Sequence, residues 1–268
     1  LEEAEKAATD MLEGGSFGDA GARIVVEEFL DGEEASFIVV TDGDVILPLA
    51  TSQDHKARDE GDVGPNTGGM GAYSPAPVVT PEIEARIMNM VIRPTLNGMK
   101  ADGHPYLGFL YAGLMIMPDG MPKVIEYNCR MGDPETQPIL ARLKSDLVDI
   151  CLSALEGSLR ERTAVWDTRA ALGVVMAAGG YPGTYTKGKA ISGLENADSN
   201  TQKVFHAGTS MAGDDVATNG GRVLCVVGLG ESVASAAQDA YAAVDKIDWE
   251  DVYFRRDIGH RAIARENG

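Results

Sequence analysis

The order of apolar and polar positions along the chain predicts both strands and helices. Short runs rich in isoleucine, valine and leucine are typical of strands, and they predict strands at residues 23–29, 35–41, 45–50, 106–117, 123–128, 171–178, 203–208 and 222–228. Apolar residues that recur every three or four positions predict helices at residues 1–13, 81–99, 133–156 and 232–247. The chain is therefore expected to be an α+β protein.

Local signals mark the ends of several of these elements. Asp133-Pro134-Glu135 offers a cap, a proline and an acid at the start of the third helix, and Gly157 fits its end. Gly14-Gly15 is expected to end the first helix. Residues 51–77 are rich in glycine and proline with little apolar periodicity, which predicts a long functional loop.

A polar stretch at residues 157–169 separates two groups of predicted elements. We therefore predict two domains, at residues 1–163 and 164–268. The smaller, C-terminal domain has its own apolar strands and an alanine-rich helix, so we expect it to be α+β as well.

Composition narrows the possible partners. The formal charge of −18 repels nucleic acid and anionic membranes, so neither is expected as a partner. No apolar run approaches the length of a membrane span. The three cysteines are scattered along the chain, which indicates reduced thiols and a cytoplasmic protein.

The first segment with candidate chemistry runs from Arg23 to Ser36, where a predicted strand leads into a group of acids. Taken alone, it is typical of a strand end with solvated carboxylates. The alternative is an adenosine hinge, in which backbone groups around Glu27 and Leu30 bind the adenine edge and a nearby carboxylate binds the ribose hydroxyls.

The second segment combines Asp54-His55-Lys56 with the glycine-rich stretch from Gly64 to Gly71. Successive glycines allow backbone N–H groups to converge, so this stretch predicts an anion nest that holds a substrate phosphate or carboxylate. A mobile surface loop is the alternative. An isolated histidine such as His55 is more often structural than catalytic.

The third segment places Glu126, Asn128 and Arg130 at alternate positions of one predicted strand. Side chains two residues apart share a face, with backbone positions about 6–7 Å apart. A carboxylate and an amide oxygen suit Mg²⁺, and an arginine just beyond can hold a carboxylate or a phosphoryl group. The alternative is a strand with a wet polar face.

Four motifs together resemble one family. They are Leu47-Pro-Leu-Ala-Thr-Ser-Gln-Asp-His-Lys56, Gly64-Pro-Asn-Thr-Gly-Gly-Met-Gly-Ala-Tyr-Ser-Pro75, Gly108-Phe-Leu-Tyr-Ala-Gly113, and Val124-Ile-Glu-Tyr-Asn-Cys-Arg130 with Gly132-Asp-Pro-Glu-Thr-Gln137. In these motifs, and in further ones up to Cys225, the chain resembles the glycinamide ribonucleotide synthetase family over nearly its whole length.

This resemblance implies an ATP-grasp fold and a ligation with three substrates: ATP, glycine and 5-phosphoribosylamine. In that reaction ATP phosphorylates the glycine carboxylate, and the amine of phosphoribosylamine attacks the acyl phosphate. The resemblance also implies Mg²⁺ or Mn²⁺ as cofactor, and a monomer or weak homodimer. Another ATP-grasp carboxylate–amine ligase and a non-catalytic nucleotide-binding module remain as alternatives.

The resemblance assigns roles to individual residues. It makes Arg130 catalytic and Glu126 and Asn128 the metal ligands. The expected ATP-binding residues are Glu27, Glu28, Phe29, Leu30 and Glu34. The expected substrate-binding residues are Asp54, Lys56, Asn66, Thr67, Gly68, Gly69, Met70, Gly71, Asp133, Pro134 and Glu135.

Three departures from the family pattern affect these expectations. The family has an N-terminal domain and a lysine-bearing glycine-rich loop before the point that matches Leu1, so the chain resembles a C-terminal portion and is expected to be inactive alone. Ala57 follows Lys56 where an arginine is common, with Arg58 next. Gly113 stands in a region where wider relatives have an acid, so the metal is expected to rely more on waters and phosphates.

Overall fold

The computed structural model describes residues 1–13 and 18–268, which form two units, Leu1–Asp31 and Gly32–Gly268. The first unit contains α1 (Glu2–Leu12) and a 3₁₀ turn (Gly18–Ala22). The prediction of the α1 helix is confirmed, and Gly14-Gly15 lies outside the described residues. Residues 23–29 are not a strand: Val26 and Phe29 are each 89% exposed and have no pairing in the described chain. That prediction is wrong because a strand needs backbone partners as well as apolar side chains.

The second unit begins with a four-stranded antiparallel sheet. Its strands, in spatial order, are β2 (Ile46–Pro48), β1 (Glu33–Thr41), β7 (Gly108–Ile116) and β8 (Pro122–Asn128). Each matches a predicted strand within a few residues. The centre of β1 is buried on both faces because its Phe37 and Val39 point to one face and its Ile38 and Val40 to the other.

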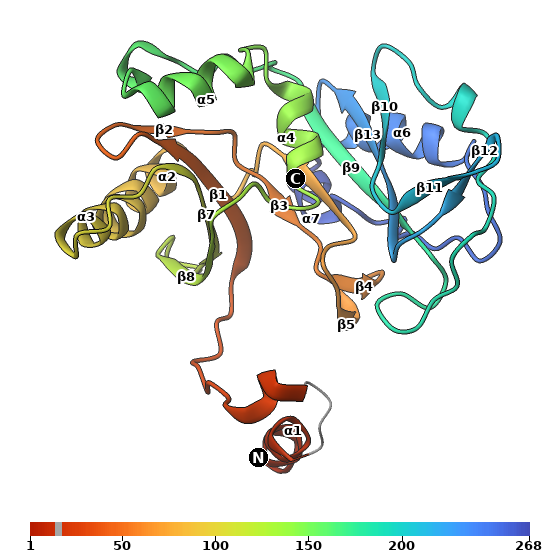
Figure 1. Ribbon diagram of the computed structural model, residues 1–268, viewed down its shortest axis with the longest axis horizontal. Coiled ribbons are helices and arrows are strands. Elements are labelled where there is room, and N and C mark those ends of the chain that lie inside the picture. Colours follow the sequence, from red (N-terminus) through yellow and green to blue (C-terminus); the bar gives the residue numbers. More distant parts are fainter. Residues whose placement is uncertain (14–17) are drawn as a thin grey trace. The chain divides into compact units, whose positions relative to one another are not determined.

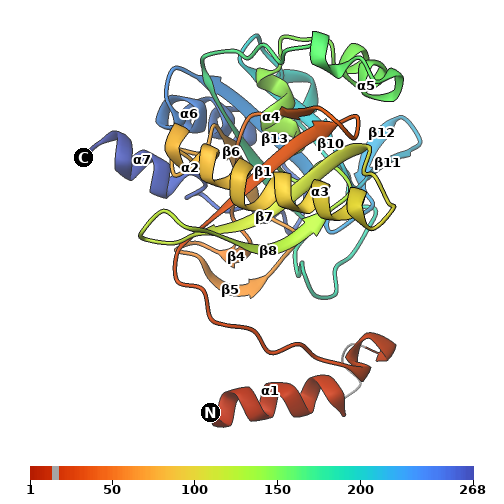
Figure 2. The same ribbon diagram turned by 90° about the vertical axis from the view of Figure 1, so that its left-hand side faces the viewer.

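A helical layer covers one face of this sheet (Figure 2). It consists of α2 (Pro81–Ile87), a π-helical turn (Met88–Ile92) and α3 (Arg93–Ala101). The helix predicted at residues 81–99 is thus confirmed, with Thr80 accepting a hydrogen bond from the backbone of Ile83 at its start. The π turn precedes Pro94, which has no N–H to donate, and Arg93 donates five residues back to Met88.

The other face of the sheet packs partly against two short helices, α4 (Thr136–Arg142) and α5 (Leu147–Glu156). One continuous helix was predicted here, and that prediction is wrong. Leu143 leaves the helix to form a β-bridge with Trp166, and the Asp146 side chain caps a new helix. Gly157 ends α5, as predicted, and the structure shows it in the left-handed conformation.

A five-stranded sheet forms the second layer of the unit (Figure 1). In spatial order its strands are β10 (Gln202–His206), β13 (Arg222–Gly230), β9 (Ala170–Ala177), β6 (Gly71–Ser74) and β3 (Gln53–Asp54). It packs against α6 (Val233–Val244) and α7 (His260–Glu266). Two hairpins complete the unit: β4 (Ala57–Asp59) with β5 (Val63–Asn66), and β11 (Thr209–Ala212) with β12 (Asp215–Thr218).

The stretch 51–77 is more ordered than its composition predicts. It contributes β3 and β6 to the five-stranded sheet, where Ala72 pairs with Gly173. This sheet therefore combines strands from both sides of the predicted boundary at residues 163 and 164. The division into domains at that point stays a prediction.

Candidate active site

One face of the four-stranded sheet lines a cavity of about 350 Å³. In the antiparallel register Ser36 lies opposite Gly113, Gly113 opposite Glu126, and Tyr111 opposite Asn128. Residues directly opposite each other share a face of the sheet. The predicted placing of Glu126 and Asn128 on one face is confirmed, since the Asn128 amide lies 3.1 Å from Glu126 Oε1.

Two other segments close this cavity. From the 51–77 stretch come Asp54, Lys56, Asn66, Thr67 and Gly68, and from the segment after β8 come Arg130, Gly132, Asp133 and Glu135. Glu34 from β1 completes the set. Most residues that the sequence singled out therefore surround a single space, although they come from three separate stretches of the chain.

Glu135 is the centre of a buried hydrogen-bond network. Its side chain is 2% exposed, and its Oε1 accepts hydrogen bonds from Ser36 Oγ (2.8 Å) and Tyr111 Oη (2.9 Å). Burial raises the pKa of Tyr111, and the Glu135 carboxylate adds to this effect. The predicted helix cap at Asp133 is wrong, because α4 begins at Thr136 and Glu135 points into this network instead.

Asp54 and Lys56 form an ion pair inside the cavity, with 3.1 Å between Oδ2 and Nζ. Burial raises the pKa of Asp54 to about 8, the nearby Glu135 adds to this, and Lys56 opposes it. Burial opposes the charge on Lys56, but attraction to Asp54 and Glu135 prevails and raises its pKa. Burial also raises the pKa of Glu34 against the opposing effect of Lys56.

Charge in the cavity is unbalanced. Five carboxyl groups line it (Glu34, Asp54, Glu126, Asp133 and Glu135), against two cationic groups (Lys56 and Arg130). Asp54 Oδ1 is buried and has no hydrogen-bond partner among the described residues. Carboxylate and amide oxygens are the ligands that Mg²⁺ prefers, so Glu126 and Asn128 fit a divalent cation. The charge of such a cation would offset part of the excess negative charge in the cavity.

The backbone N–H groups of residues 67–70, which the predicted anion nest would use, already have partners within the chain, so these four residues do not form the nest. Gly68 donates to Tyr181 Oη, Gly69 to Thr67 Oγ1, and Met70 to the His55 carbonyl. Thr67 donates to the Lys56 carbonyl. A substrate in this cavity would therefore meet mainly side chains here.

Close packing explains the glycines better than anion binding does. Gly69 has a φ of +115°, and a Cβ there would lie 2.3 Å from Pro134 Cδ and 2.7 Å from Asp54 Oδ1. Met70 is fully buried in the core, and Gly71 belongs to β6. Gly69, Met70, Gly71 and Pro134 therefore support the cavity without lining it, and their predicted contact with substrate stays a prediction.

The predicted adenine-binding residues Glu27, Glu28, Phe29 and Leu30 belong to the first unit. The adenosine hinge therefore also stays a prediction.

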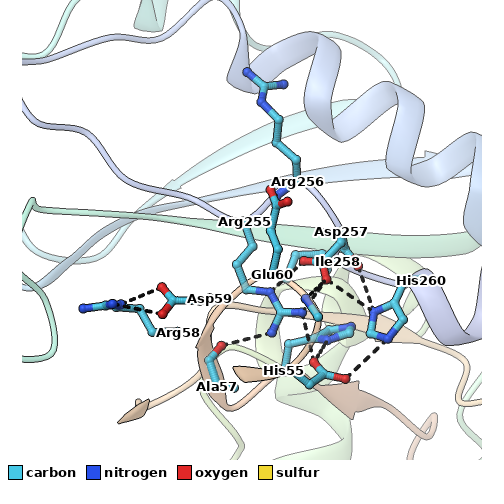
Figure 3. Close-up of polar contacts among 12 residues, drawn as sticks. His55, Ala57, Arg58, Asp59, Glu60, Arg255, Arg256, Asp257, Ile258 and His260 are labelled. Atoms are coloured by element: carbon cyan, nitrogen blue, oxygen red, sulfur yellow. Dashed lines mark hydrogen bonds and ion pairs between the residues drawn. The ribbon is translucent and has the colours of Figure 1, made fainter. Parts of the chain in front are cut away.

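A second polar cluster joins the segment around His55 to the C-terminal segment (Figure 3). His55, Asp62 and His260 could in principle hold a metal, with ligand atoms within 4.8 Å of one another. The two oxygens of Asp62, however, already accept hydrogen bonds from Arg255 (2.9 Å) and Arg261 (2.8 Å). The structural interpretation of His55 fits this cluster, because its Nε2 accepts from the Gly259 backbone at 2.9 Å.

Four residues near the cavity were not predicted as site residues: Ser36, Tyr111, Tyr181 and Arg222. The period-2 pattern of β1 could have identified Ser36, which lies two residues after Glu34. Tyr111 stands within one of the quoted motifs. Nothing in the sequence near Tyr181 or Arg222 indicates that they contact Gly68, more than 100 residues away.

Comparison with known families identifies the class of protein. A family model for the phosphoribosylglycinamide synthetase ATP-grasp (A) domain matches residues 1–136, and the model for the C domain of the same synthetase matches residues 171–261. The biotin carboxylase domain of a Hydrogenobacter thermophilus 2-oxoglutarate carboxylase has a similar fold, with a TM-score of 0.70 at 14% identity over 94% of this chain and 53% of that one. The fold and the cavity thus define an α+β protein of the ATP-grasp class.

The chain belongs to the phosphoribosylglycinamide synthetase family. A phosphoribosylamine–glycine ligase of Allochromatium vinosum is 67% identical over 266 residues, which are 99% of this chain and 62% of the relative. One of Escherichia coli O6:H1 is 64% identical, with the same coverage. The crystal structure of the Thermotoga maritima ligase has a TM-score of 0.83 at 34% identity, over 96% of this chain and 63% of that one.

The chain thus spans about 62% of the length of these sequence relatives. None of the helices in the described ranges is long and apolar enough to cross a membrane.

Proposed function

We propose that the protein is a ligase that uses ATP to join glycine to 5-phosphoribosylamine, giving glycinamide ribonucleotide, ADP and phosphate. The observation that carries this proposal is the single cavity, in which the acids, amide and cations expected of such a ligase meet. The names of relatives at 62–67% identity support the choice of substrates. Free Cys129, Cys151 and Cys225 support a cytoplasmic setting.

Glu126 and Asn128 would hold Mg²⁺ or Mn²⁺ against the phosphates of ATP. Asn128 now points an amide N–H at Glu126, and rotation of the amide would present its oxygen instead. The bound cation would supply positive charge that neutralises the phosphate oxygens.

The residues of the chain position the reacting groups around that site. Arg130 would stabilise charge on the γ-phosphoryl group as it moves to the glycine carboxylate, which yields glycyl phosphate and ADP. The amine of phosphoribosylamine would then attack the acyl carbon and release phosphate. Lys56 and the buried Glu135 network would fix the shape of the cavity, because their side chains are held by Asp54, Ser36 and Tyr111.

An isotope experiment tests both the substrates and the order of steps. The full-length protein is incubated with ATP, phosphoribosylamine and glycine whose carboxylate carries ¹⁸O. If glycyl phosphate forms, one ¹⁸O atom appears in the released phosphate. Phosphate without ¹⁸O would refute the acyl-phosphate route. ADP release that does not depend on glycine, or that is faster with another amino acid, would refute the assigned substrates.

A further inference from the structure

A second cavity, of about 560 Å³, adjoins the first and shares Gly68, Arg130, Gly132 and Asp133 with it. Its other polar lining residues include Gln137 and Arg222. The two cavities differ in charge. The first has five carboxyl groups, whereas the second has two guanidinium groups and only the carboxyl group of Asp133.

Arg222 reaches this cavity from β13. Its Nη1 donates to the carbonyls of Gly68 (2.6 Å) and Asp133 (2.8 Å), and its Nη2 donates to Asp133 Oδ2 at 2.9 Å. A guanidinium has five N–H groups, and the Nε of Arg222 makes no hydrogen bond to any described residue. The side chain is 21% exposed, so these remaining donors are accessible to a ligand.

Asp133 balances only one of the two guanidinium groups. The second cavity therefore keeps a positive charge in a protein whose formal charge is −18. Such a local charge favours an anionic group here without a metal, whereas phosphates in the acidic first cavity would depend on a bound cation. Gln137 Oε1 is buried and has no hydrogen-bond partner among the described residues, which leaves an acceptor for a hydroxyl group.

We propose that this second cavity binds the phosphate end of phosphoribosylamine. Arg222 contacts the phosphate, and Gln137 accepts a hydrogen bond from a ribose hydroxyl. This inference rests on the proposed function, which supplies the phosphorylated amine substrate. The shared lining by Gly68 and Arg130 then lets the amine end enter the first cavity, where the activated glycine lies.

The competing interpretation is that Arg222 only positions Gly68 and Asp133. Competitive inhibition by ribose and by ribose 5-phosphate distinguishes the two, because these probes differ only in the phosphate. Both inhibition constants are measured in competition with phosphoribosylamine. The constant for ribose divided by the constant for ribose 5-phosphate is the ratio that measures how much the phosphate strengthens binding. If Arg222 contacts the phosphate, Arg222→Gln lowers this ratio by about tenfold to a hundredfold. If Arg222 only positions the loops, both constants rise together and the ratio is unchanged, which overturns the proposal.

Matched variants complete the test. Arg160→Gln removes an exposed arginine outside the lining of both cavities and should leave the ratio unchanged. Gln137→Leu should raise both inhibition constants and preserve the ratio, since the two probes share the ribose hydroxyls. If Arg222→Gln does not fold, as judged by circular dichroism, Arg222→Lys is used and should still lower the ratio, because an ammonium lacks the guanidinium fork. An unchanged ratio in that variant also overturns the proposal.

The failure of this inference is distinguishable from failure of the proposed function. If the wild-type protein does not ligate glycine, the proposed function fails, and calorimetric titration with the same two probes still gives the ratio. If ligation proceeds and the ratio is close to one in the wild type, the second cavity does not hold the phosphate.

Discussion

The ammonium of Lys56 lies 3.1 Å from the carboxylate of Asp54, and the two partners differ greatly in exposure: 34% for the Lys56 side chain and 3% for that of Asp54. A single cation thus partly compensates a carboxyl group that has almost no access to water. The pKa of Asp54 is consequently raised to about 8 in spite of its partner. Part of the acid in the cavity therefore titrates close to neutral pH.

This shift predicts how stability depends on pH. An unfolded aspartate has a pKa of about 3.9, so between that pH and about 8 the folded state binds a proton that the unfolded state does not. Stability due to Asp54 is therefore lost as pH rises across this interval. Asp54→Asn should unfold at a higher temperature than the wild type at pH 8, with a smaller difference at pH 5. Thermal unfolding without nucleotide or metal measures both, with the exposed Asp214→Asn as control.

The proposed metal site predicts a graded series of kinetic effects. Glu126→Gln keeps the shape of the side chain but removes its charge, so the turnover number should fall roughly a hundredfold or more. Asn128→Ala should cost less, since a water can replace a neutral ligand, and excess Mg²⁺ should partly restore its rate. Arg130→Ala should not respond to Mg²⁺. The test measures the rate of each variant across a Mg²⁺ titration, and Glu156→Gln at an exposed position is the control. If Glu126→Gln kept both full rate and normal Mg²⁺ dependence, the metal site would be excluded.

The packing of the glycine-rich stretch predicts opposite effects at two glycines. Gly69→Ala forces a methyl group against Pro134 and Asp54 at a φ of +115°, so it should destabilise the fold by about 1–3 kcal/mol. Gly98 lies in helix α3 with nothing within 4 Å of an added Cβ, and Gly98→Ala should stabilise by about 0.5–1 kcal/mol. Urea unfolding of both variants makes the comparison. Equal effects would contradict the packing interpretation.

The second polar cluster, around His55 and the C-terminal segment, predicts that Arg255 and Arg256 contribute very differently to the free energy of unfolding. Arg255 is fully buried and binds Asp62. It also binds Asp257 and the Ala57 carbonyl (Figure 3). Arg255→Met removes the buried guanidinium that binds both carboxylates and leaves Asp62 with Arg261 alone among its arginine partners, so it should destabilise by about 3–5 kcal/mol. Arg256→Met, at an exposed position, should cost less than about 1 kcal/mol. A small loss for Arg255→Met in denaturant unfolding would show that the cluster does not hold the C-terminal segment in place.

The sequence alone determined the elements whose signals are local. The short apolar run at residues 35–41 predicted a strand. The spacing of Glu126 and Asn128 predicted their common face, because neighbours along a strand alternate regardless of what packs around them. The same logic failed at residues 23–29, where apolar side chains are present and no partner strand pairs with them in the described chain. It failed again at Leu143, where a bridge to Trp166 interrupts the helical pattern.

Only the tertiary structure decided how the glycine-rich stretch is used and which parts of the chain complete the cavity. Glycines allow N–H groups to converge on an anion, but whether those groups are free depends on Tyr181 and Thr67, which occupy two of them. Arg222 meets Gly68 across 154 residues of sequence through the pairing of β6 with β9 and of β9 with β13. Contacts of this kind depend on which strands pair and how the sheets stack. The residue type at a single position does not indicate that arrangement.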